Sequence, residues 1–98
     1  MSYFPFNARP LGSQVALSVT SSAAVALTVP PDAEFAVISI ETQAVRFRDD
    51  GVDPTASDGV LLPVTSSSPW VYVGTYGLSR IKFIAQSGTA VLNVSFYG

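Results

Sequence analysis

Apolar residues in this chain recur at every second position in short runs, and this pattern restricts the fold more than any other feature. The clearest run covers residues 90–97, where every second residue is apolar: Ala90, Leu92, Val94 and Phe96. A period of two places alternate side chains on opposite faces of a β-strand. The segment is therefore predicted to be a strand with one buried face and one more exposed face.

Similar runs recur along the chain, separated by Gly, Pro, Asp and Ser residues that favour turns. Strands are expected at residues 14–19, 25–29, 35–41, 45–48, 60–64, 70–73, 78–85 and 90–97. The first two are expected to pair as a hairpin through Thr20–Ser22. No segment repeats apolar residues at helical spacing over a helical length. About eight short strands indicate an all-β fold, an antiparallel β-sandwich of jelly-roll-like form with no substantial helix.

The domain organisation follows from length and from the irregular start of the chain. Ninety-eight residues make one domain. Residues 1–12 are expected to form an aromatic arm, and residues 13–98 a single β-sandwich domain. The arm contains Tyr3, Phe4 and Phe6, whose rings would stay in water unless they pack on something. Packing on the same domain and docking on a neighbour both remain open.

The composition excludes several classes of function. The chain has no cysteine and no histidine, which excludes disulfides, Cys/His zinc sites and histidine-based catalysis. The five basic residues are spread from Arg9 to Lys82 and the net charge is −2, so no basic patch for nucleic acid is expected. No apolar run reaches the roughly 18 residues of a membrane span. The N-terminal segment lacks the features of a signal peptide, so a soluble cytosolic product is expected. No cofactor is expected.

Charged residues are scarce. They make up 12% of the chain while apolar residues make up 48%, whereas soluble domains carry roughly 25% charged residues. Exposed apolar surface usually marks a contact with another protein. We therefore expect part of this surface to be buried in an assembly.

Acidic residues cluster between residues 49 and 58, at Asp49, Asp50, Asp53 and Asp58. Their oxygens could hold a calcium ion, although the spacing departs from that of the helix–loop–helix calcium site. The favoured interpretation is turn formation with Arg46 and Arg48 as counter-charges. Two carboxylates could also hydrolyse a glycoside, but acids on one loop of a small domain offer little cleft.

Aromatic residues form a second candidate group, made up of Trp70, Tyr72, Tyr76 and Tyr97. Such rings can form a platform for carbohydrate or for a protein partner. In a small sandwich they more often fill the core or its ends. Both interpretations remain open, and the interface interpretation includes Arg46 and Arg48 because arginine is enriched in interfaces.

Two stretches in the second half of the chain form recognisable motifs. The first is Arg46-x-Arg48-Asp49-Asp50-Gly51, followed by Pro54-Thr55-Ala56 and Gly59. The second is Ile81-x-Phe83-Ile84-Ala85-x-Ser87-Gly88-x-Ala90-x-Leu92-Asn93-Val94. Together they resemble small virion proteins of tailed bacteriophages, and the resemblance implies a non-enzymatic component of the particle, a head decoration or cement protein. The first forty residues carry no matching motif.

The expected function is thus that of a structural protein of the virion, made in the cytoplasm of the host bacterium. Its expected partners are the major capsid protein or other virion proteins, and further copies of itself, for example as a trimer. The expected partner-binding residues are Tyr3, Phe4, Phe6, Arg46, Arg48, Asp49, Asp50, Trp70 and Tyr72. The alternative is a component of the tail, neck or fibre, including a receptor- or glycan-binding module.

Overall fold

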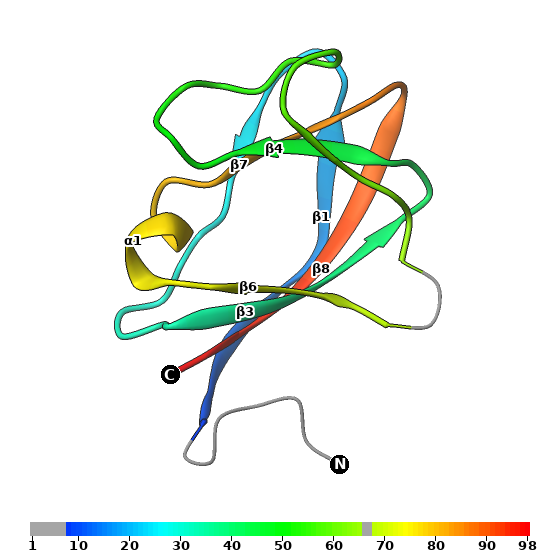
Figure 1. Cartoon of the computed structure of the whole chain (residues 1–98). Coiled ribbons are helices and arrows are strands. Elements are labelled where there is room, and N and C mark those ends of the chain that lie inside the picture. The colour runs from blue at the N-terminus through cyan, green and yellow to red at the C-terminus, as the bar shows by residue number, and fades with distance from the viewer. Residues whose placement is uncertain (1–7, 66–67) are drawn as a thin grey trace.

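The computed structural model describes residues 8–65 and 68–98, which form two four-stranded antiparallel sheets packed face to face. The elements are β1 (Pro10–Thr20), β2 (Val25–Ala26), β3 (Phe35–Glu41), β4 (Val45–Arg48), β5 (Val60–Leu62), β6 (Trp70–Val73), α1 (Thr75–Leu78), β7 (Lys82–Ala85) and β8 (Thr89–Tyr97). Figure 1 shows β3 and β6 in the lower layer, β4 and β7 in the upper layer, and α1 at the left end. The expected all-β sandwich is confirmed.

The strand order is that of a jelly roll. The first sheet has the order β1-β8-β3-β6, and the second has the order β2-β7-β4-β5. The outermost strands of the chain pair with each other (β1 with β8), then β2 with β7, β3 with β6 and β4 with β5. The chain therefore resembles one long hairpin wrapped around a common core, which is the jelly-roll arrangement.

The expected hairpin between residues 14–19 and 25–29 is wrong. β1 pairs with β8 in the first sheet, while β2 pairs with β7 in the second. The turn after Thr20 therefore carries the chain from one layer to the other. Both segments have an apolar face, and placing them in opposite layers lets each face contribute to the core. Pro10 to Gly12, expected in the arm, belong to β1.

The core lies between the two sheets. In β8 the alternation is as expected, because Ala90, Leu92, Val94 and Phe96 are all buried. Phe83 on β7 and Ile38 on β3 reach the same core from opposite layers and are 0% exposed. The period-two pattern of the sequence is thus realised as inward-facing rows on both sheets.

The segment expected as one long strand, residues 78–85, is divided in two. Leu78 ends the single helical turn α1, and its side chain is buried. The strand β7 begins only at Lys82. Within the described residues, no helix is long and apolar enough to cross a membrane.

Candidate functional site

The acidic loop between β4 and β5 is attached to the outer face of the second sheet. Arg46 points outward from β4, and its Nε and Nη1 donate hydrogen bonds to the Ala56 and Gly59 carbonyls, each at 3.0 Å. Lys82 on the neighbouring β7 forms an ion pair with Asp53 at 2.9 Å. Ile84 lies opposite Arg46 in the register and is only 5% exposed, although it is outside the main core. The loop therefore covers this face of the sheet.

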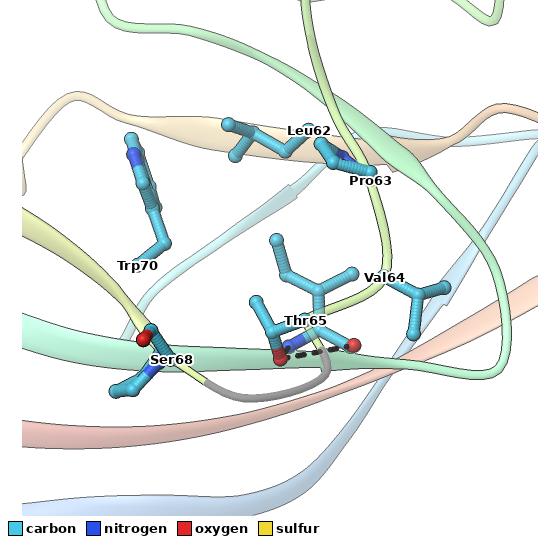
Figure 2. Close-up of a pocket in the computed structure, with 8 residues that line it drawn as sticks. Leu62, Pro63, Val64, Thr65, Ser68 and Trp70 are labelled. Carbon is cyan, nitrogen blue, oxygen red and sulfur yellow. Dashed lines mark hydrogen bonds between the residues drawn. The ribbon is translucent and has the colours of Figure 1, made fainter.

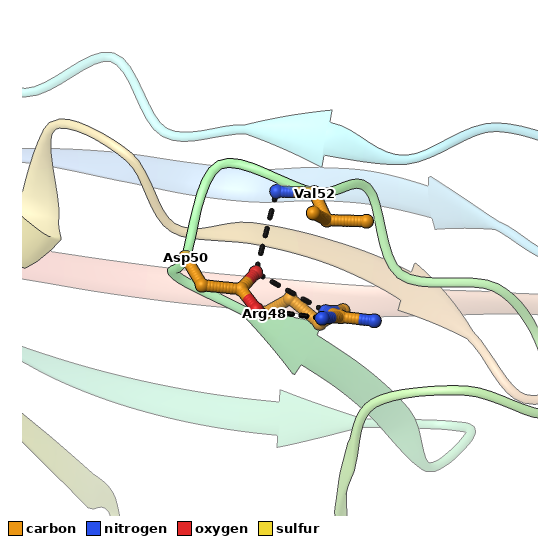
Figure 3. A network of polar contacts seen from close by, with 3 residues as sticks. All are labelled: Arg48, Asp50 and Val52. Atoms are coloured by element: carbon orange, nitrogen blue, oxygen red, sulfur yellow. Dashed lines mark hydrogen bonds and ion pairs between the residues drawn. The ribbon is translucent and has the colours of Figure 1, made fainter.

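Arg48 and Asp50 form a two-pronged ion pair at the start of the loop. Arg48 Nε and Nη2 donate to the two carboxylate oxygens of Asp50 at 3.1 and 2.6 Å, and the Val52 N–H donates to the same carboxylate (Figure 3). The hydrogen bond from Arg48 lowers the pKa of Asp50 to about 2. The expected arginine pairing is thus found for Arg48, whereas Arg46 binds loop carbonyls.

The carboxylates of the loop do not converge. Asp50 binds Arg48, Asp53 binds Lys82, and Asp49 accepts a hydrogen bond from the Tyr72 hydroxyl. No group of three acidic side chains in the described part of the chain is arranged to hold a metal ion. This geometry favours the interpretation of the acidic residues as turn-forming and ion-pairing groups.

Four rings gather where β6 meets the second sheet. Phe47 lies 5.0 Å from Trp70 and 6.3 Å from Tyr72, and Phe83 lies 6.2 Å from Trp70, between ring centroids. Trp70 and Tyr72 are half-buried on the inward face of β6. These two rings therefore belong to the packing between the layers and remain partly exposed.

The other two aromatic candidates lie in different surroundings. Tyr76 on α1 is 73% exposed, with the Arg80 guanidinium 5.1 Å from its ring centroid. Tyr97 stacks on Phe35 at 5.1 Å on β8 and β3. The contacts of the four aromatic residues are thus divided among three places, and they do not form the single platform that the sequence suggested.

The hydroxyl of Tyr72 joins β6 to the acidic loop. Burial, followed by the hydrogen bond to Asp49, raises the pKa of Tyr72 from 10.0 to about 12. A raised pKa means that the folded state holds the phenolic proton more strongly than the unfolded state does. The resulting stabilisation is fully present below pH 10 and is lost as the pH rises from 10 to 12.

Replacing Tyr72 with phenylalanine should remove this alkaline dependence. We expect the variant to lose about 1 kcal/mol of unfolding free energy at pH 7, because the hydrogen bond to Asp49 disappears. Between pH 10 and 12 the melting temperature should fall less in Y72F than in the wild type. Thermal melts followed by circular dichroism measure this, and Y76F, altered at an exposed ring, is the control. An equal alkaline fall in Y72F and the wild type would contradict the role of Tyr72.

Exposed apolar side chains lie on the edge strands β5 and β6 and on the segment that follows β5. We call this group the apolar rim, and it consists of Val60, Leu61, Val64, Val71 and Val73. Their side chains are between 38% and 74% exposed. Leu61 lies on the outer face of the second sheet, where it pairs with Arg46, and Val71 and Val73 lie on the outer face of the first sheet. Single exposed apolar residues are ordinary, but apolar side chains on edge strands mark places where other chains can make contact.

An open pocket of about 290 Å³ is lined in part by β5 and β6. Figure 2 shows Leu62 and Pro63 above it, Thr65 and Ser68 below it, and Trp70 at one end. The lining is mainly apolar, and Thr65 is held to the β3 backbone by hydrogen bonds in both directions. The pocket offers an apolar recess with few polar groups, and none of its lining residues carries a charge.

The structure places only some of the predicted partner-binding residues near one another. Tyr3, Phe4 and Phe6 lie outside the described residues, so arm docking stays a prediction. Trp70 and Tyr72 are in contact, and the Tyr72 hydroxyl reaches Asp49. Arg48 and Asp50 form a separate pair, and Arg46 holds the middle of the loop.

Sequence reasoning missed the apolar rim. One signal was present, because residues 70–73 are apolar at every position and would therefore be apolar on both faces of a strand. The sequence did not show that β5 and β6 are edge strands. Nothing in the sequence indicated that Lys82 and Asp53, which are 29 positions apart, would form an ion pair.

Comparisons with protein-family models, with curated proteins and with solved structures found no match to this chain. The surface of the fold has two distinctive parts, the loop attached over the second sheet and the apolar rim.

Proposed function

We propose that the chain is a non-enzymatic structural protein of a tailed-bacteriophage virion, specifically a head decoration or cement protein. It is made in the host bacterial cytoplasm, associates with further copies of itself and bridges subunits of the major capsid protein. The proposal begins from the resemblance at residues 46–59 and 81–94. Its physical support comes from the surface of the fold.

The apolar rim is the observation that carries the proposal. It exposes valine and leucine side chains on two edge strands of a chain in which only 12% of residues are charged. Such a surface is stabilised when another protein covers it. Each contact is small, but a protein present in many linked copies converts weak contacts into lasting attachment.

The acidic loop supports a structural role. Asp49, Asp50 and Asp53 each have a different partner, and the Arg46 guanidinium binds two loop carbonyls. These contacts hold a loop in place rather than setting two carboxylates across a cleft, as glycoside hydrolysis requires. Jelly-roll domains occur in capsid proteins and also in lectins, so the fold alone does not choose between the two.

Binding to empty phage heads that lack this protein tests the proposal. We expect saturable binding, with on the order of hundreds of copies per head as for a decoration of the shell. Leu61→Lys, in the apolar rim, should weaken binding, whereas Val15→Lys, at an exposed site on β1, should not. Co-sedimentation with the heads and quantitative gel analysis measure both. A chain that stays monomeric and fails to bind the heads overturns the proposal.

A glycan- or receptor-binding role in a tail, neck or fibre is the second candidate. The observation in its favour is that Trp70 lines the open pocket. Trp70 is the single tryptophan of the chain, so tryptophan fluorescence reports on the surroundings of this one side chain. A saturable change in emission on titration with host surface glycans would favour this role, as would a copy number of only a few per particle.

A further inference from the structure

The four edge strands of the sandwich differ in how well they are protected. β1 begins at Pro10 and has two register shifts, β2 has two residues, and β5 has three residues followed by Pro63. Proteins use such short, irregular or proline-bounded edges to prevent unwanted pairing. β6 is preceded by Pro69, but it is longer than β2 and β5, pairs with β3 without a register shift and carries no charged residue. It is therefore the least protected edge.

The hydrogen bonds of β3 show which way the β6 backbone faces. The Gly74 N–H donates to the Glu34 carbonyl at 2.8 Å, in the same register that pairs Tyr72 with Ala36. Along an extended strand, alternate residues direct their backbone groups to the same neighbour. Trp70 and Tyr72 therefore direct their backbone groups to β3, as Gly74 does.

Val71 and Val73 direct their backbone groups to the open side of β6. Each has one N–H and one carbonyl, and no strand in the described ranges 8–65 and 68–98 pairs with that side. Their side chains stand on the outer face of the sheet and are 38% and 74% exposed. The edge thus combines free hydrogen-bonding groups with apolar side chains.

We propose that β6 pairs with β6 of a second copy of this chain, antiparallel and across a two-fold axis. Val71 then lies opposite Val73 of the partner subunit, and Tyr72 lies opposite its own counterpart. In this register the backbone groups of Val71 bond to those of the partner's Val73, and the backbone groups of Val73 bond to those of the partner's Val71. About four hydrogen bonds form in total. The β1-β8-β3-β6 sheet of one copy then continues into the same sheet of the other copy, and the exposed valines of both copies become neighbours.

Neighbouring registers are worse. A shift by two residues in one direction places Val73 opposite Pro69, which has no N–H to donate. A shift in the other direction places Val71 opposite Thr75, where α1 begins. The local sequence therefore selects the register centred on Tyr72.

A second copy is the occupant that fits because the edge complements itself. A two-fold contact uses the same surface of both copies, so a charged side chain in it would lie near the same side chain of the partner subunit and be repelled. β6 has no charged residue, and both of its faces are apolar. The proposed function needs copies to associate without saying through which surface. This inference names the surface, and it rests on the proposed function only for its biological use.

Two substitutions of matched exposure test the pairing. Val73 is 74% exposed on β6, and Val15 is 75% exposed on β1 at the opposite edge of the same sheet. A lysine on an edge strand opposes pairing, so V73K should raise the dissociation constant for self-association at least about tenfold. V15K should associate like the wild type. Sedimentation velocity over a range of concentrations measures this.

A wild-type chain that remains monomeric at high concentration overturns the inference, and so does a V15K variant that weakens association as much as V73K. Far-UV circular dichroism of both variants checks that each is folded. Because the free chain is used, failure here is distinct from failure to bind phage heads. A foreign strand that binds this edge more tightly than a second copy does would also overturn it.

Cysteine cross-linking tests the register directly, because the chain has no cysteine of its own. In the proposed register, a V71C chain mixed with a V73C chain should form a disulfide-linked dimer. Either variant alone should not, since identical positions lie about 8 Å apart, beyond the reach of about 7 Å for a disulfide. The register would be contradicted if V71C alone gave as much disulfide-linked dimer as the mixture does, or if the mixture gave no linked dimer.

Discussion

Replacing Phe83 with alanine is expected to lower the free energy of unfolding by about 3–5 kcal/mol. Phe83 is 0% exposed on β7, and its ring contacts Phe47 and Trp70 at centroid distances of 6.3 and 6.2 Å. Removing the ring leaves a cavity where the two layers meet, and contacts with rings of both layers are lost. A domain of this size has a total stability of about 5–15 kcal/mol, so F83A should be close to unfolding.

Urea unfolding followed by circular dichroism measures this effect. The melting temperature should also fall by more than about 10 °C. The control is Tyr76→Ala, which removes an equally large ring that is 73% exposed on α1. Its cost should be within about 0.5 kcal/mol, as is usual for surface positions. Similar losses in both variants would contradict the placement of Phe83 at the centre of the core.

Replacing Gly59 with alanine should cost about 2–3 kcal/mol, because two effects act together. Gly59 has a φ of +129°, which residues with a side chain rarely adopt. A Cβ there would also lie 3.0 Å from the Phe47 carbonyl oxygen and 3.3 Å from Cβ of both Arg46 and Pro54. The carbonyl of Gly59 accepts a hydrogen bond from Arg46, so a shift of the loop would break that contact as well.

Gly74→Ala separates the two effects. Gly74 has nearly the same φ, +133°, but nothing lies within 4 Å of the position of an added Cβ. Only the cost of the backbone conformation applies, about 1 kcal/mol. Chemical unfolding of both variants gives the comparison. Equal losses would show that crowding under the loop contributes nothing, and the close attachment of the loop to the second sheet would then be wrong.

Strand positions could be predicted because the alternation of side chains is local. Residues 35–41, 45–48 and 70–73 were expected as strands and correspond to β3, β4 and β6. The Arg48–Asp50 pair was also within reach, since the two residues are two positions apart and the turn holds them together. In each case the interacting groups are neighbours in the chain, so no knowledge of the fold was needed.

Strand partners could not be predicted in the same way. Alternation shows that a segment has an apolar face but not which strand lies beside it, and the proposed hairpin of the first two strands failed for this reason. The contact of Tyr72 with Asp49 spans 23 positions, and that of Lys82 with Asp53 spans 29. Ile84 shares its strand face with the charged Lys82, yet it is buried on a sheet face that the acidic loop covers.

The sequence by itself determined an all-β chain of short strands, their inward rows and a turn-forming acidic loop, because period-two patterns and turn residues act over a few positions. The tertiary structure alone decided the pairing order, the attachment of the loop by Arg46 and Lys82, and the position of β6 at an open edge. Those features depend on burying all the apolar faces at once. The wrapped arrangement of both sheets meets that requirement, and it leaves Val71 and Val73 exposed.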